Sequence, residues 1–356
     1  MIYGSDTSLA NGLHLSVDWL SFTLPDPNTY DDALVLMGFS LSDFKICSAG
    51  LNGYSSQMRL DSASCYVSIQ YDGHDGMGVH VDISGSSVRA VLESYANEHK
   101  VSSTPFSNSA YEYSDLQGGV LIDFLKDICS TGHITRIDVA IDDMGEKYYS
   151  VSQLREIFAS ASYVSKFRTW EERAKYSKGY ENLGRTLYIG SRKSDVMLRI
   201  YDKMKEQNDK LKYSDEPLLT TPWTRWEFEF KHDYAIKVVN YLLSGVSLAS
   251  VTVGILNNYL RIVELDNARK DRCTVSSVWL AFTMAIEKLS LYCKPVSKTL
   301  ADKKSWLGRQ VAPTLATVCM ADGGDMSFFY RLLDSGSSRL SASNMQLIKS
   351  ALEVSA

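Results

Sequence analysis

Cysteine motifs, membrane-length apolar runs and a signal peptide are all missing from this chain of 356 residues. Its six cysteines are scattered and form no Cys-x-x-Cys pair, which argues against a zinc ribbon or a thiol redox centre. A chain of this length gains little from disulfides, so we expect reduced thiols. No apolar run is long enough to cross a bilayer, and the N-terminus lacks a basic-then-apolar region. We therefore expect a soluble cytoplasmic protein.

Acidic residues outnumber basic ones in the whole chain, but positive charge is concentrated in one segment. The net charge is −5 and the pI about 5.7, which excludes a generally basic nucleic-acid coat. Residues 161–212, here called the basic belt, hold 13 Lys and Arg against 7 Asp and Glu. The belt thus carries +6 and the rest of the chain −11.

Aromatic residues interleave with the cations of the basic belt. Cations neutralise phosphates and rings stack on unpaired bases, so the pattern predicts contact with DNA. The alternative is a solvated charged helix whose aromatics lie in the core. The candidate DNA-binding residues are Lys175, Lys178, Arg192 and Lys193.

Residues 187–201 read as two apolar runs around a polar turn, which predicts a β-hairpin. Tyr201 ends the second run, beside Arg199 and Lys203. Neighbouring cations favour the phenolate form of a tyrosine, and a phenolate can attack phosphorus. The alternative is an amphipathic tyrosine at a sheet edge.

Two further segments, 134–143 and 223–230, alternate between charged and apolar residues and predict strands. Each places an arginine and following acids on one face. Carboxylates that project together from neighbouring strands would suit Mg²⁺ or Mn²⁺. The alternative is cross-strand pairing between arginine and carboxylate. The acids in question are Asp138, Asp142, Glu227 and Glu229.

The order of predicted elements indicates an α+β protein. Strands are predicted at 15–24, 65–71 and 79–83, and helices at 29–37, 87–98, 121–129 and 151–159. The repeated strand–strand–helix order suggests an internal pseudo-repeat, either two small sheets or one curved antiparallel sheet with helices on one side. After His232 only helices are predicted, at 235–243, 247–263, 276–292, 300–320, 326–333 and 342–352. We expect an α+β domain over 1–233 and an all-helical C-terminal domain over 234–356.

Several of these segments follow one another in a recognisable order. They read VHVDISGSSVRAV, ITRIDVAIDD, GRTLYIGSRKSDVMLRIYDKMKE and TRWEFEFK, after a DWLSFTL start. This order resembles the replication initiation factor family, which includes rolling-circle plasmid initiators, conjugative relaxases and initiators of CTX-type filamentous phages. The resemblance runs from about Leu15 to Lys231. It implies an antiparallel-sheet nicking domain and a metal-dependent nickase whose tyrosine joins a 5′ phosphate at an origin and frees a 3′ hydroxyl primer.

The resemblance also implies roles for individual residues. Tyr201 of RIYDK becomes the nucleophile, with Arg199, Lys203 and Glu206 in support. Many rolling-circle nickases outside the family bind metal through a His-hydrophobic-His triplet, and this chain has none. A carboxylate-rich Mg²⁺ or Mn²⁺ site is therefore implied, with the ligands open among Asp138, Asp142, Glu227 and Glu229.

The implied partners are origin DNA, single-stranded or extruded at the nick site, and a host helicase of the UvrD/Rep type. The sequence has no GxxxxGK[ST] phosphate loop with which the chain could hydrolyse a nucleoside triphosphate and unwind DNA itself. The helical C-terminal domain could bind DNA or support a homodimer. Two other functions stay open: a non-enzymatic origin-binding protein, and a metal-independent tyrosine recombinase or topoisomerase.

Overall fold

The computed structural model describes residues 12–62, 65–99, 119–212, 216–284, 291 and 300–354. The chain divides into two compact units, residues 1–293 and 294–356. Among the described residues, no helix combines the length and apolar character that a bilayer crossing requires.

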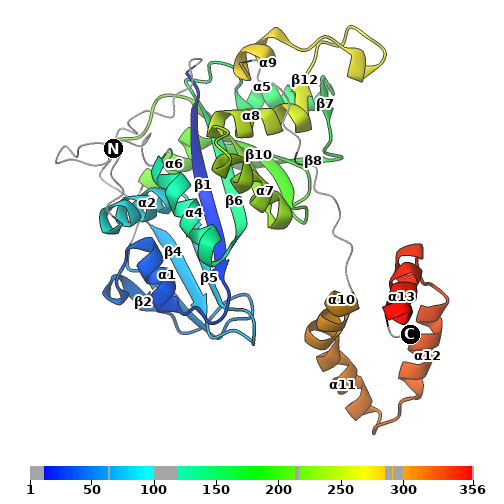
Figure 1. Ribbon diagram of the computed structural model, residues 1–356. Coiled ribbons are helices and arrows are strands. Elements are labelled where there is room, and N and C mark those ends of the chain that lie inside the picture. Colours follow the sequence, from blue (N-terminus) through cyan, green and yellow to red (C-terminus); the bar gives the residue numbers. More distant parts are fainter. Residues whose placement is uncertain are drawn as a thin grey trace. The chain divides into compact units, whose positions relative to one another are not determined.

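A ten-stranded sheet forms the centre of the first unit (Figure 1). Its order is β2-β3-β4-β5-β1-β6-β11-β10-β9-β8, and every neighbouring pair is antiparallel. The strands are β1 (His14–Leu24), β2 (Phe44–Ile46), β3 (Ser56–Leu60), β4 (Tyr66–Tyr71), β5 (Val79–Ser84), β6 (His133–Met144), β8 (Trp170–Tyr176), β9 (Asn182–Ile189), β10 (Val196–Asp202) and β11 (Trp223–Lys231). The mixed helical and antiparallel architecture confirms the predicted α+β class.

Helices cover the apolar face of this sheet, and α4 and α7 lie in front of the central strands in Figure 1. The alternating apolar residues of β6, such as Ile137 and Val139, are fully buried in the core beneath them. The helices of this unit are α1 (Tyr30–Met37), α2 (Ser87–Glu98), α4 (Leu121–Thr131), α5 (Val151–Ala159), α6 (Lys203–Leu211), α7 (His232–Leu243), α8 (Leu248–Tyr259) and α9 (Ser277–Phe282).

The sheet is built from two halves with the same order of elements. One half runs β1-α1-β2-β3-β4-β5-α2, and the other runs β6-α5-β8-β9-β10-β11-α7. They meet where β1 pairs with β6, so the expected pseudo-repeat takes the form of one continuous sheet. The second half differs by two insertions: the short strand β7 (Tyr163–Ser165), which lies between α5 and β8 outside the ten-stranded sheet, and the helix α6 between β10 and β11.

The region after β11 differs from the sequence prediction in two ways. The helix predicted over 247–263 ends at Tyr259, because Leu260–Ile262 form a strand, β12, that pairs with β7 (Tyr163–Ser165). Helix α7 packs on β6 and β11, so the boundary predicted after residue 233 falls inside the first compact unit. Of the helix predicted over 276–292, residues 285–290 and 292 lie outside the described residues.

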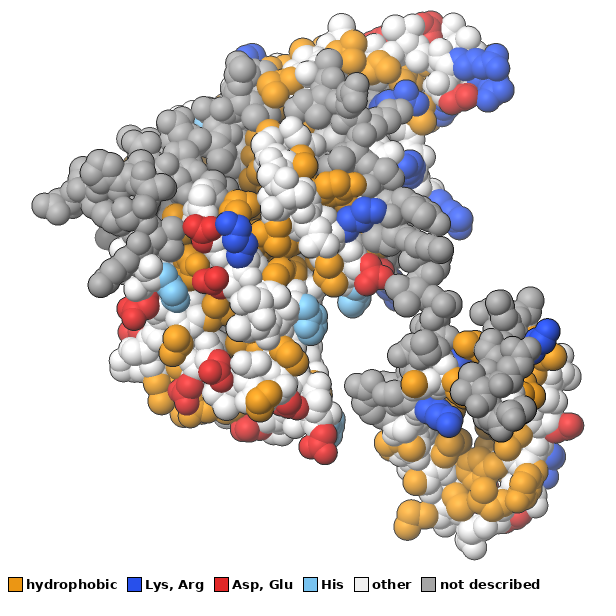
Figure 2. Space-filling model, in the orientation of Figure 1, with side chains coloured by type: hydrophobic (Ala, Val, Ile, Leu, Met, Phe, Trp, Pro, Cys, Tyr) orange, Lys and Arg blue, Asp and Glu red, His pale blue; other side chains and the backbone are white. Residues whose placement is uncertain are grey.

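The second unit consists of short helices. They are α10 (Leu300–Trp306), a short π-helix (Leu307–Val311), α11 (Ala312–Ala321), α12 (Ser327–Ser337) and α13 (Ala342–Val354). Among its described side chains only Phe329 is buried. Met320 and Leu333 are among its exposed apolar side chains. Figure 2 shows a patch of hydrophobic side chains on the surface of this unit.

Candidate active site

Tyr201 lies one residue before the end of β10, between two partner strands. Its backbone is opposite Arg225 of β11 and Thr186 of β9. Its hydroxyl donates a hydrogen bond to Glu227 Oε2 at 2.9 Å, and Lys203 Nζ lies 3.5 Å from the same oxygen. The predicted hairpin is confirmed, and it delivers the tyrosine hydroxyl to a charged cluster on the polar face of the sheet.

The prediction that neighbouring cations favour the phenolate form of Tyr201 is wrong for the protein without bound DNA. Burial raises the pKa of the phenol well above its ordinary value. Arg225 and Arg199 act to lower that pKa, while Glu227 acts to raise it. Desolvation dominates, so flanking cations alone do not ionise this tyrosine.

Arg225 sits in a buried network that joins three strands. Its guanidinium donates to Asp142 of β6 at 2.6 and 2.7 Å, and to Asp18 of β1 at 2.6 Å. Trp223 Nε1 adds a hydrogen bond to Asp142 at 2.7 Å. The sequence alone did not indicate Asp18, because it lies 207 residues before its partner, Arg225. The only signal in the sequence was that Asp18 is the single acidic residue of the first strand.

A second arginine–carboxylate cluster lies nearer the start of β6. Arg136 donates to both oxygens of Asp138, at 2.8 and 2.6 Å, and pairs with Glu229 at 2.8 Å. Asp138 is fully buried, and desolvation raises its pKa to about 7 against the opposing effect of Arg136. The charges of Glu227 and Glu229 add to the increase.

The four predicted metal ligands each face a cation in this arrangement. Asp142 is paired with Arg225, Asp138 and Glu229 with Arg136, and Glu227 with Arg199. In the part of the chain that the structure describes, no group of three or more acid, His or Cys side chains is placed to hold an ion. The acids do gather on neighbouring strands, but as arginine–carboxylate pairs, and this arrangement does not fit a preformed metal site.

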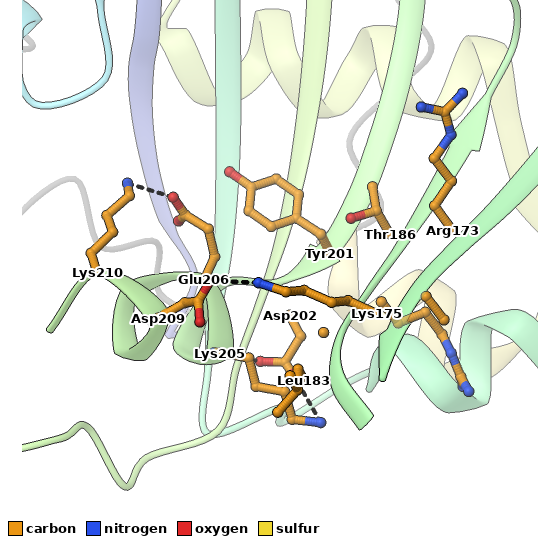
Figure 3. A pocket seen from close by; sticks show the side chains of 13 residues that line it. Arg173, Lys175, Leu183, Thr186, Tyr201, Asp202, Lys205, Glu206, Asp209 and Lys210 are labelled. Atoms are coloured by element: carbon orange, nitrogen blue, oxygen red, sulfur yellow. Dashed lines mark hydrogen bonds and ion pairs between the residues drawn. The ribbon is translucent and has the colours of Figure 1, made fainter. Parts of the chain in front are cut away.

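A groove of about 440 Å³ opens beside Tyr201, between strands β8 and β9 and helix α6 (Figure 3). Its charged lining holds five cations against three carboxylates, and the carboxylates are themselves paired. Glu206 binds Lys203 at 2.7 Å and Lys210 at 2.5 Å, and Asp209 binds Lys175 at 2.9 Å. The charged residues of the lining are Arg173, Lys175, Arg185, Lys205, Lys210, Asp202, Glu206 and Asp209.

The four candidate DNA-binding residues are all exposed, but they fall at two places. Lys175 lies near the end of β8 and Lys178 in the turn that joins β8 to β9, and Lys175 lines the groove. Arg192 and Lys193 lie in the β9–β10 turn, where Arg192 stacks 4.5 Å from the Tyr188 ring centroid. The eight-residue strand β9, roughly 26 Å long, separates the two pairs. This part of the belt is built on strands and turns, not on the charged helix considered as an alternative.

Comparisons with known proteins add independent findings. The family described as replication initiation factor matches residues 132–332. A Bacillus subtilis (strain 168) protein named "Putative DNA relaxase NicK" is 29% identical over 279 residues, covering 77% of this chain and 72% of that protein. The fold is similar to the solved structure of a rolling circle replication initiator protein from Geobacillus stearothermophilus. The TM-score is 0.62 at 22% identity, and the match covers 79% of this chain and 99% of that one.

Proposed function

Since the chain belongs to the replication initiation factor family, we propose that it is a rolling-circle replication initiator that nicks origin DNA through Tyr201. The observation that carries the proposal is the hydroxyl of Tyr201, held within a cluster of buried charges beside a groove whose lining holds five cations against three carboxylates. Every side chain of the proposed chemistry lies within residues 1–233, the part of the first compact unit that we propose to carry out nicking.

The proposed reaction is phosphoryl transfer to tyrosine. The Tyr201 oxygen attacks phosphorus in line, the 3′ oxygen leaves, and a 5′-phosphotyrosine ester and a 3′ hydroxyl primer result. Because the ester conserves the phosphodiester bond energy, the displaced strand can later be rejoined. Lys203 and Arg199 offer positive charge where the phosphoryl oxygens gain negative charge. The DNA strand that is cut must enter the groove single-stranded or extruded, because stacking in a duplex blocks the in-line approach of the tyrosine oxygen to phosphorus.

Members of this family generally use a divalent metal, and we expect Mg²⁺ or Mn²⁺ here. The candidate ligands are Asp138, Asp142, Glu227 and Glu229, all of them ion-paired with arginine. An ion would have to displace a guanidinium group to reach any of these carboxylates.

Nicking of supercoiled origin DNA in Mn²⁺, followed by EDTA, tests this function. We expect nicked circles, a detergent-resistant protein–DNA adduct, and loss of both when EDTA is added. Origin binding without any nick would identify a non-enzymatic origin-binding protein instead. Nicking that resists EDTA would favour a tyrosine recombinase or topoisomerase, which needs no metal.

Neutralising Lys175, Lys178, Arg192 and Lys193 together should weaken binding to DNA of any sequence and flatten its salt dependence. Each lost phosphate contact should reduce the slope of log affinity against log salt by roughly 0.7 to 0.9. The acidic remainder of the chain repels phosphate, which makes the basic belt the electrostatic entry point.

Two half-variants sharpen this measurement. Removing Lys175 and Lys178 alone should also slow adduct formation, because Lys175 lines the groove beside Tyr201. Removing Arg192 and Lys193 should affect binding only. An unchanged slope in the quadruple variant would exclude the four residues from the DNA interface, and a loss of origin preference at an unchanged slope would make them base readers.

We also propose a host helicase of the UvrD/Rep type and a homodimer as partners. The chain has no GxxxxGK[ST] motif to drive unwinding itself. Equal unwinding of nicked DNA with and without this protein would contradict the helicase partnership.

The apolar side chains exposed on residues 294–356 suit a dimer contact or a DNA-binding module. A monomeric mass in light scattering would contradict the dimer.

A further inference from the structure

We propose that the groove beside Tyr201 holds the DNA phosphate next to the scissile one, through the Thr186 hydroxyl and the Arg173 guanidinium. The inference rests on the proposed function and adds the path of the cut strand: across the sheet, from Tyr201 towards the last strand, β8. It is carried by one row of the strand register, in which Tyr201, Thr186 and Arg173 are direct neighbours on β10, β9 and β8.

The three side chains of this row point to the same face of the sheet. Residues directly opposite each other in antiparallel strands share a face, and Thr186 is opposite both Tyr201 and Arg173. Figure 3 shows Thr186 between the other two, and all three line the groove. Neighbouring strands lie about 4.8 Å apart, so the backbone of Arg173 is roughly 10 Å from that of Tyr201. The row therefore leads from the proposed nucleophile along the groove.

Thr186 offers a hydroxyl that is available to a ligand. Within the described part of the chain, no hydrogen bond engages this hydroxyl, although the side chain is partly buried. Two residues earlier on the same face, Gly184 has no side chain, and a Cβ added there would meet no described atom within 4 Å. The hydroxyl thus borders open space, in which a phosphate oxygen can accept its hydrogen bond.

Arg173 supplies a positive charge that a phosphate can reach. Its side chain is 54% exposed, and its partner Glu171, at 2.7 Å, is similarly exposed. Because such exposed pairs contribute little to stability, a phosphate can replace Glu171 at little cost. The guanidinium lies over the Tyr188 ring, 5.2 Å from its centre, so the ring supports it from one side. An arginine can then present two parallel N–H donors to the phosphate.

The lysines of the groove are less suited to hold this phosphate directly. Lys175 is paired with Asp209 at 2.9 Å and Lys210 with Glu206 at 2.5 Å, and both carboxylates line the same groove. A phosphate bound at either lysine would meet the negative charge of its partner. The lysines therefore add long-range attraction, while the direct contact falls to the hydroxyl and guanidinium of the row.

Fixing the neighbouring phosphate places the scissile phosphorus in line with the Tyr201 oxygen. The neighbouring phosphate keeps its charge throughout the reaction, so the contact is equally strong before and during the attack. Such a contact lowers the DNA concentration that the reaction needs and leaves the rate at saturation unchanged. It also carries no sequence information, because every nucleotide has the same phosphate.

Adduct formation by Arg173→Gln tests the inference. The substrate is the single-stranded oligonucleotide that spans the mapped nick site, supplied at increasing concentration with Mn²⁺ held constant. We expect the oligonucleotide concentration at half-maximal rate to rise about 10- to 100-fold, as for the loss of one hydrogen bond to a charged group. The rate at saturation should stay within about threefold of wild type.

Two substitutions at Thr186 separate its hydroxyl from its shape. Thr186→Val keeps the branched side chain and removes the hydroxyl, so the half-saturating concentration should rise about 10-fold. Thr186→Ser keeps the hydroxyl and should remain close to wild type.

Arg155→Gln is the matched control for Arg173→Gln. Arg155 is 48% exposed and pairs with Glu172 of the same strand, β8, at 3.3 Å. Glu172 precedes Arg173 and so points to the other face of the sheet. The control loses the same charge from an equally exposed pair, but it should keep the wild-type half-saturating concentration.

Neutral methylphosphonate linkages identify the phosphate that is held. Each oligonucleotide carries one such linkage, at the first or second position on either side of the nick site. One of these positions should weaken binding to the wild-type chain about 10- to 100-fold and have little further effect on Arg173→Gln, because the contact is already lost. Whether that position lies 5′ or 3′ of the nick gives the direction in which the strand crosses the sheet.

Several outcomes would overturn the assignment. Equal half-saturating concentrations for Arg173→Gln and Arg155→Gln would exclude Arg173 from the contact. Equal losses in Thr186→Val and Thr186→Ser would exclude the hydroxyl, and a lower saturated rate at unchanged half-saturation would mean that Thr186 acts on Tyr201 and not on DNA. A wild-type chain that tolerates every methylphosphonate would contradict the proposal even if a variant failed to fold.

The proposed nucleophile is tested separately. If these outcomes went against the phosphate contact, an inactive Tyr201→Phe variant would still leave the proposed function intact. An active Tyr201→Phe variant would remove the proposed function itself.

Discussion

Tyr201→Phe should abolish both the nick and the covalent adduct while leaving DNA binding close to normal. The substitution removes the attacking oxygen and its hydrogen bond to Glu227, but it keeps the ring that packs within 5.8 Å of Arg199 and 5.5 Å of Lys203. Loss of one such hydrogen bond costs about 1 kcal/mol, so the fold should survive. Gel analysis for the adduct and a binding titration on the same oligonucleotide measure the two effects separately.

Tyr188→Phe is the matched control for this variant. Tyr188 lies on the neighbouring strand β9, opposite Arg199, and keeps its ring contacts to Arg173 and Arg192 as phenylalanine. It should form the adduct at the wild-type rate. Adduct formation by Tyr201→Phe together with its loss in Tyr188→Phe would transfer the nucleophile to Tyr188.

Arg225→Ala should destabilise the first unit by about 3 to 5 kcal/mol. It leaves Asp18 and Asp142 as buried carboxylates without their shared cation, and uncompensated buried charge is costly. Each kcal/mol of lost stability lowers the melting temperature of a unit of this size by about 2 to 4 °C, so the variant should melt at a clearly lower temperature. Adding Asp142→Asn should recover part of the loss, because one of the two unpaired charges is then removed.

Arg155→Ala provides the comparison. Arg155 pairs with Glu172 at 3.3 Å, and its side chain is about half exposed, so water screens the pair. Its removal should cost no more than about 1 kcal/mol. Calorimetric unfolding of both variants checks the contrast, and equal losses would show that the Arg225 network does not hold β1, β6 and β11 together.

Alternation along the chain predicted the strands that carry the site. The charged and apolar residues of β6 and β11 do separate onto two faces, because successive side chains of a strand point in opposite directions. Turn chemistry at residues 190–195 likewise predicted the hairpin whose second strand carries Tyr201. The order of elements also predicted the two-part construction, since the same order occurs in each half.

Alternation does not reveal which side chains meet across strands, and the remaining features depend on that. The register places Arg225 opposite Asp142 and Tyr201, and it brings Glu227 to the hydroxyl. Burial, which sets the pKa of Tyr201, follows from the assembled sheet and from α6, not from the flanking residues. Asp18 enters the site only because β1 pairs with β6, far along the chain. The sequence therefore indicated most of the residues of the site, while Asp18 and the pairing of the side chains required the structure.

The most direct test of the central claim is to identify the residue that becomes joined to DNA. The covalent complex formed on the mapped oligonucleotide is digested with protease and nuclease, and the modified peptide is sequenced by mass spectrometry. We predict a peptide that contains Tyr201 with a nucleotide attached through its 5′ phosphate. A nucleotide on any other residue, or one attached through a 3′ phosphate as a type IB topoisomerase would leave it, would contradict the account.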